Sequence, residues 1–443
     1  MFKTLVNALK VKDIRTRILF TIFIMVVFRM GCVITIPGID AAAVQETLNN
    51  LLGTEGNALL SVFSGGSLEN MSILALNVSP YITSSIIIQL LTIAIPALEE
   101  MQHDGEDGRK KMMAITRYVT VILAILQASG ISISLKNANS LGADANWFTV
   151  VTMIICLTAG STLVMWLGER ITEKGIGNGI SILLLINIVS RMPNDFSNLY
   201  TMFVKKQFND AEYVKGIGAA LLIIAIVILT TVLVIILQDA KRVIPIQYSQ
   251  KMSGRRLVGG RGTEMPIKVN TAGVIPVIFA SSLMSLPTMI ITMFNIKVTN
   301  TVVSNIISGM SQNSWFSKEH PWGYLGLALY IVLVFMFAYF YTSITFNPME
   351  VANNLKKGGA SVPGIRPGKP TQEYLEKVLN HIVFIGAVGL IVVAIIPIFF
   401  SGVFGADVSF GGTSLIIIVG VILETIQQLD SKMLDRNYEG FLK

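Results

Sequence analysis

The chain is dominated by apolar runs of about 20 residues, the length of helix that crosses the hydrocarbon core of a membrane. Ten such runs lie near residues 18–36, 72–95, 118–134, 147–168, 180–190, 216–238, 271–293, 323–346, 378–400 and 411–430. Only 14% of the residues are charged, whereas a soluble domain carries about 25%. Most of the outer surface must therefore face something other than water. We predict an all-α integral membrane protein with ten transmembrane helices.

The first and fifth runs fit the pattern of a span less simply than the others do. Basic residues precede the first run and three alanines follow it, which is also the pattern of a cleaved signal peptide. The run from 18 to 37 is longer than the 7–15 residues of a signal peptide, so we expect a retained first span. The fifth run is short, and we expect its helix to begin earlier, within residues 175–179.

Orientation follows from the lysines and arginines, which concentrate on the cytoplasmic side of membrane proteins. With the N-terminus cytoplasmic, 26 of the 34 basic residues fall in cytoplasmic segments and 7 in external ones, with Arg29 inside the first span. The sequence therefore predicts that both termini are cytoplasmic.

Ten spans divide into two sets of five, here residues 1–210 and 211–443. An odd number of spans in each half requires the second half to be inverted, a common plan for membrane passageways. Both the second and seventh spans place a proline two residues before an isoleucine, Pro80 before Ile82 and Pro276 before Ile278, followed by a Ser-Ser pair. An internal repeat explains this match, and so does the general frequency of proline and serine in membrane helices.

The spans carry few groups that could do chemistry. Buried ionisable side chains mark ion pathways and proton relays, but here they are limited to Arg29 and Glu424. The chain contains no His-Glu-x-x-His, Gly-x-Ser-x-Gly or Walker motif, and its 2 cysteines and 3 histidines have no metal spacing. We predict no cofactor, metal or catalytic residue, and therefore no enzyme. The glycines of residues 175–179 lack the strand and lysine of a phosphate loop.

The spans do offer isoleucines and uncharged polar side chains. These residues fit ordinary helix packing, in which hydroxyls and amides bridge neighbouring helices. They also fit an apolar constriction that closes a pore by excluding water. A segment at residues 57–67 is apolar but too short to cross, and such a segment survives at membrane depth only beside protein or a water-filled cavity.

Two cytoplasmic loops, 239–270 and 347–377, are longer and more basic than topology requires. They suit a polyanionic partner such as RNA or an acidic protein face. Positive-inside bias with anionic lipid contact accounts for Arg255 and Arg256 equally well. Arg366 lies within a Pro/Gly-rich turn that presents its side chain in a fixed place, which favours docking.

Several stretches resemble the SecY family of protein-conducting channels. They include Phe-Arg-Met-Gly at 28–31, residues 71–91, the stretch Trp-Leu-Gly-Glu-Arg-Ile-Thr-Glu-Lys-Gly-Ile-Gly-Asn-Gly-Ile-Ser at 166–181, residues 269–276, 346–368 and Phe-Gly-Gly-Thr-Ser-Leu at 410–415. The resemblance spreads over nearly the whole chain. It implies two inverted five-helix halves around a central pore, which passes unfolded polypeptides across the bacterial plasma membrane and inserts membrane proteins into it. A secondary transporter with inverted repeats is the alternative.

The resemblance also implies the site residues. An apolar pore ring would consist of Val78, Ile82, Leu184, Ile188, Ile278 and Ile417, and departs from all-isoleucine at Val78 and Leu184. A re-entrant plug helix would lie at 57–67, with Asn57, Leu60, Phe63, Ser64, Gly65 and Gly66. A lateral gate between the second and third spans and the seventh and eighth would take polar contacts from Thr83, Gln89, Gln127 and Ser282.

The implied partners follow from the same resemblance. Arg255, Arg256 and Arg366 would contact the SecA ATPase motor or the ribosome. SecE and SecG subunits, polypeptides that bear signal sequences, and the lipid bilayer would be the other partners. Because the chain lacks nucleotide chemistry, the energy of transport would come from such a motor, from ribosomal synthesis or from the membrane potential.

Overall fold

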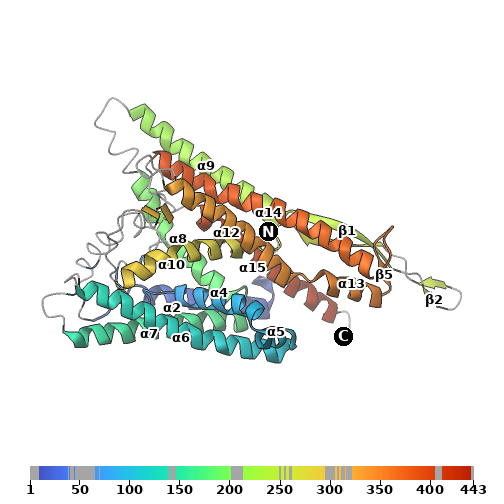
Figure 1. The fold of residues 1–443 in the computed structure, drawn as a ribbon, viewed down its shortest axis with the longest axis horizontal. Helices are drawn as coiled ribbons and strands as arrows, with labels where there is room; N and C mark the ends of the chain where they lie inside the picture. Colours follow the sequence, from blue (N-terminus) through green and yellow to red (C-terminus); the bar gives the residue numbers. More distant parts are fainter. Residues whose placement is uncertain are drawn as a thin grey trace.

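The computed structural model describes residues 9–37, 39, 44, 65–68, 70–137, 141, 146–200, 213–248, 251–253, 256–258, 262–294, 305–306, 309–310, 315, 322–404 and 412–440. Long helices form a bundle whose axes run roughly together (Figure 1). They are α2 (Lys12–Gly31), α4 (Ser79–Ala94), α6 (Gly105–Asn137), α7 (Trp147–Lys174), α8 (Gly179–Tyr200), α9 (Tyr213–Asp239), α10 (Ile275–Phe294), α12 (Gly323–Thr345), α14 (Lys369–Phe404) and α15 (Gly412–Gly440). Each predicted span falls on one of these helices, and the all-α prediction is confirmed.

The described helices have the composition of membrane spans. Five of them contain a stretch long and apolar enough to cross a membrane, and α4 with the short helix α5 (Pro96–His103), bent by 105° between them, adds a sixth if the pair is one span. The fifth span begins at Gly179, as the sequence indicated.

The second span differs from its predicted range, because it is helical only from Ser79 onward. Residues 73–78 form turns, and Asn77 has a φ of 51°. Backbone hydrogen bonds hold this segment in place, including one from the Ile73 nitrogen to the Ile34 oxygen at 2.9 Å. Gly160 of α7 lies directly against the Ile73 carbonyl, where any larger side chain would collide. Tertiary contacts therefore replace the first turns of the expected helix.

The bundle packs as two groups of helices. Among the described residues, α2, α4, α6, α7 and α8 pack on one another, and α9, α10, α12, α14 and α15 do the same. Two closely packed helix pairs join the groups, α6 with α10 and α8 with α15. The division at residue 210 stays a prediction, and this packing supports it.

The loop predicted at 239–270 contains strands. β1 (Lys241–Tyr248) pairs antiparallel with β4 (Gly262–Lys268), with Ile244 opposite Met265. The short strands β2 (Lys251–Ser253) and β3 (Arg256–Val258) extend this hairpin away from the bundle (Figure 1). Ile244 and Ile246 are buried, and this alternation is the sequence signal of a strand.

The hairpin also touches the second basic loop. β1 pairs with β5 (Ala360–Ser361), which follows the short helix α13 (Pro348–Lys357). The two basic loops are therefore joined at one end of the bundle.

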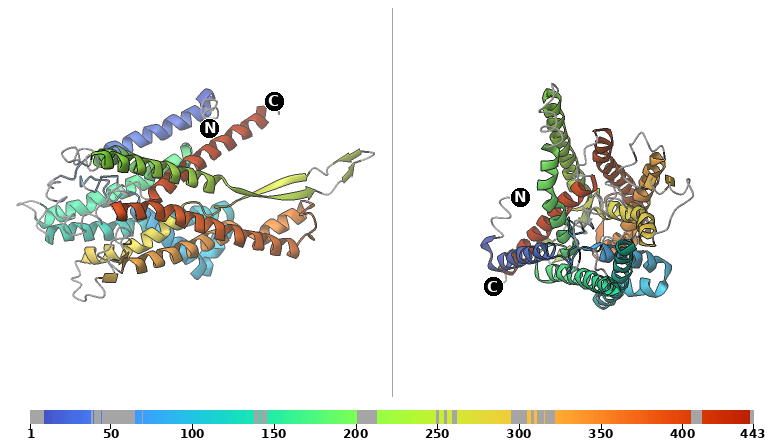
Figure 2. Two further views of the ribbon diagram at one scale, coloured as in Figure 1. Left: turned by 90° about the horizontal axis from the view of Figure 1, so that it is seen from above. Right: turned by 90° about the vertical axis from the view of Figure 1, so that its left-hand side faces the viewer.

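The two ends of the described chain lie on the same side as this hairpin (Figure 2). Ile14 near the start of α2, Ile176 in the turn between α7 and α8, and Leu429 near the end of α15 share one buried cluster.

Candidate functional site

The six residues of the predicted ring come together in the fold. Four are buried members of one apolar cluster, namely Val78, Leu184, Ile188 and Ile417, and the half-buried Ile82 and Ile278 pack against it. They come from α4 and the residue before it, and from α8, α10 and α15. Helices from both ends of the sequence therefore contribute aliphatic side chains to one cluster, which also includes residues of α2 and α7.

Local helix geometry explains the contribution of α8. Leu184 and Ile188 are four residues apart and so lie on the same face of the helix. Asn187, three residues after Leu184, is its neighbour on the helix surface and is fully buried. Sequence reasoning missed Asn187, whose only signal was a lone amide within an apolar span.

The predicted plug is only partly visible, because Asn57, Leu60, Phe63 and Ser64 lie outside the described residues. Gly65 and Gly66 have φ angles of 63° and 81°, a region that favours glycine. Gly65 lies against α8, since a Cβ atom on it would come within 2.8 Å of the Asn187 Oδ1. Its carbonyl accepts a hydrogen bond from the Arg29 guanidinium at 3.4 Å. The single arginine of the first span thus contacts a residue within the predicted plug range.

The predicted gate residues lie on three helices. Thr83 and Gln89 belong to α4, Gln127 to α6 and Ser282 to α10. Gln127 is buried, and its Oε1 has no hydrogen-bond partner in the described part of the chain. The Thr83 hydroxyl donates to the Ser79 carbonyl of its own helix at 3.0 Å. Because α6 packs on α10, the seam between them is closed in this structure.

Of the predicted docking residues, Arg366 is exposed on the turn before α14. The Thr371 hydroxyl donates to the Arg366 carbonyl at 2.8 Å, which stiffens the turn. Arg256 lies on β3 in the hairpin, and Arg255 lies outside the described residues. Since β1 pairs with β5, the two loops share one surface.

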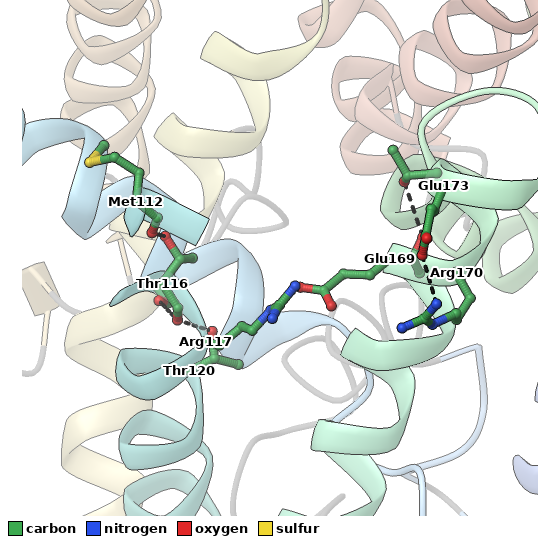
Figure 3. A network of polar contacts seen from close by, with 10 residues as sticks. Met112, Thr116, Arg117, Thr120, Glu169, Arg170 and Glu173 are labelled. Atoms are coloured by element: carbon green, nitrogen blue, oxygen red, sulfur yellow. Dashed lines mark hydrogen bonds and ion pairs between the residues drawn. The ribbon is translucent and has the colours of Figure 1, made fainter. Parts of the chain in front are cut away.

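Charged groups occur away from the ring. Figure 3 shows Arg117 of α6 reaching Glu169 of α7, and the two form an ion pair at 2.7 Å. Arg170 pairs with Glu173 on its own helix at 2.7 Å. The Arg117 side chain is half exposed, and exposed pairs contribute at most about 1 kcal/mol. These contacts join helices and form no catalytic arrangement, and the described residues contain no group of side chains suited to hold a metal ion.

The SecY family model matches residues 72–426 of this chain. The chain belongs to the SecY family. Curated SecY proteins, named protein translocase subunits, match it end to end. The Streptomyces galbus protein is 43% identical over 461 residues, covering 100% of both chains, and the Thermotoga maritima protein is 41% identical over 451 residues, covering 100% of this chain and 98% of its relative.

Solved structures agree with the SecY assignment. A structure described as that of a protein-conducting channel superposes with a TM-score of 0.64 at 16% identity, over 95% of this chain and 92% of that one. Sec61 in the canine ribosome–channel complex from the endoplasmic reticulum superposes with a TM-score of 0.61, also at 16% identity and the same coverage. At this identity the likeness shows the fold, and the SecY membrane fold predicted from the sequence is confirmed.

Proposed function

We propose that this chain is the central pore subunit of a Sec translocase, which passes unfolded secretory polypeptides across the plasma membrane and inserts membrane proteins into it. The observation that carries the proposal is the apolar cluster to which Val78, Leu184, Ile188 and Ile417 contribute. A channel for polypeptides of any sequence cannot use a specific pocket. It needs an uncharged constriction, formed by the predicted ring residues and called the waist below, that closes when no polypeptide is present. An apolar constriction closes by excluding water.

The plug and gate are part of the same proposal. The segment that ends at Gly65 and Gly66 would close the external funnel, held by Arg29 and by contact with α8. The seam between α6 and α10 would open sideways for signal sequences and membrane helices. Polar side chains at such a seam, Gln127 among them, lower the cost of parting and rejoining the two helices because water or an incoming helix can pair with them.

The chain is a channel subunit and not itself an enzyme, so work must be supplied from outside. We propose that the SecA motor and the ribosome dock on the surface shared by the hairpin and the Arg366 turn. Both basic loops contribute to this surface, and exposed basic groups attract acidic proteins and RNA. SecE and SecG subunits would complete the complex.

The orientation of this multi-pass plasma membrane protein follows from its charges. We propose that both termini are cytoplasmic, since 26 of the 34 basic residues would then lie on that side. Ile14 and Leu429 share a cluster at one end of the bundle, which agrees with termini on the same side.

The alternative function, an ion-coupled secondary transporter, is not favoured. It requires charged or broken-helix coordination of a solute at the midplane. The six predicted ring residues that belong to or pack against one cluster between the two groups of helices are aliphatic instead.

The test is to reconstitute this chain together with SecE into lipid vesicles and to add SecA outside the vesicles. Addition of ATP and a secretory polypeptide should make the polypeptide resistant to external protease. A chain that imports a small solute along an ion gradient, and leaves the polypeptide accessible to protease, would contradict the proposal.

A further inference from the structure

Asn187 is an uncharged polar group buried beside the apolar ring. Its side chain is 0% exposed, and neither its Oδ1 nor its Nδ2 has a hydrogen-bond partner among the residues that the structure describes. The large majority of buried side-chain polar atoms in proteins are paired, so an amide with two unpaired atoms calls for an explanation. Burial without a partner disfavours the arrangement in which it occurs.

The position of this amide suggests when it becomes paired. Asn187 is three residues after Leu184 and so lies beside it on the surface of α8, and Leu184 belongs to the ring cluster. Gly65, within the predicted plug, lies so close to Asn187 that a Cβ atom on residue 65 would come within 2.8 Å of the Asn187 Oδ1. Movement of Gly65 away from α8 would expose the amide to whatever occupies the pore.

A polypeptide in the pore has its own unpaired groups. An extended chain presents N–H and C=O groups at every residue, and an aliphatic ring satisfies none of them. An asparagine side chain both donates and accepts hydrogen bonds, so its Oδ1 can accept from a main-chain N–H. The peptide group is common to all sequences, and an uncharged amide would trap neither acidic nor basic substrates.

We propose that Asn187 is the point at which the waist hydrogen-bonds the main chain of the passing polypeptide, and that Gly65 covers it in the closed channel. This inference rests on the proposed function. It assigns a substrate contact to a residue outside the apolar ring.

The experiment compares two substrates in the reconstituted channel with SecA. Each substrate is arrested with a short test run at the waist. The run is alanines in one substrate and prolines in the other, and proline has no N–H to donate. After ATP is removed, the rate at which the arrested chain slides back is measured. The wild-type channel should release the proline substrate about fivefold faster, the factor that corresponds to one net hydrogen bond.

Two variants test whether the amide causes this difference. Asn187→Leu keeps the side-chain size, and Asn187→Ala reduces it. In both variants the release rate of the proline substrate divided by that of the alanine substrate should fall below the wild-type value, because the amide no longer retains the alanine substrate. Ser190→Ala is the matched control, because the Ser190 hydroxyl already bonds the backbone carbonyl of Asn187 at 2.7 Å within α8. This variant should keep the wild-type ratio.

The outcomes separate the two proposals. An unchanged ratio in both Asn187 variants would overturn the main-chain contact while the function stands. A wild-type channel that captures neither substrate would overturn the proposed function, and this inference with it.

Discussion

Gln428 of α15 accepts a hydrogen bond from the backbone N–H of Gly177 at 3.1 Å. Gly177 lies in the turn between α7 and α8 and has a φ of 82°. The neighbouring Ile176 N–H donates to the Thr21 hydroxyl of α2 at 3.2 Å. One turn is thus fixed by side chains from both groups of helices, at the end of the bundle where Ile14 and Leu429 share a buried cluster.

We expect Gln428→Ala to lower the free energy of unfolding by about 1 kcal/mol, because the part-buried Gly177 N–H loses its partner. The midpoint of thermal unfolding in mild detergent measures this loss. Gln427→Ala is the control, since Gln427 accepts from Lys268 at 2.6 Å at an exposed position. Equal midpoints for the two variants would argue against a structural role for the Gln428 contact.

We expect replacement of Ile82, Ile278 and Ile417 by serine to raise ion leakage through the resting channel. Hydroxyls at the waist hold water, and a hydrated constriction conducts. Conductance of reconstituted vesicles is the measurement. Ile422→Ser is the control, because Ile422 is on α15 but 43% exposed on its outside. Leakage that stays at the wild-type level in the ring variant would contradict the apolar seal.

We expect Gly65→Ala to raise ion leakage more than Gly66→Ala does. Both residues have positive φ, where an alanine costs about 1–2 kcal/mol. A Cβ on Gly66 meets nothing within 4 Å, whereas one on Gly65 would press on Asn187. The comparison in the same conductance assay therefore separates backbone strain from contact with α8. Equal leakage in the two variants would remove the claim that Gly65 seals against that helix.

We expect Arg366→Glu to reduce SecA-driven import by about tenfold while the protein still folds, since the change replaces attraction by repulsion at the docking surface. The assay is protease protection of a secretory substrate, with unfolding midpoints as the folding check. Lys369→Glu makes the same charge change at an exposed position three residues away. Normal import by the Arg366 variant would refute docking there, and equal defects in both would indicate general electrostatic attraction.

The sequence alone determined the features that depend on local composition. Apolar runs locate the spans because lipid requires about 20 apolar residues of helix, and every predicted span falls on a helix. The near absence of charge in the spans already argued against an ion-coupled site. The ring residues were named by resemblance, and the fold brings all six together, although their role as a seal stays a prediction.

The tertiary structure decided which distant residues meet. The pairing of Arg29 with Gly65 and the burial of Asn187 beneath that glycine leave no local signal in the sequence, whereas Pro80 in the first turn of α4 does mark its late start. Both contacts of Gly65 depend on the closeness of segments that lie 36 to more than 100 residues apart. Hydrophobicity settles whether a segment enters the membrane, because that depends on its own side chains. Hydrogen bonds and close packing between segments exist only once the helices have been brought together.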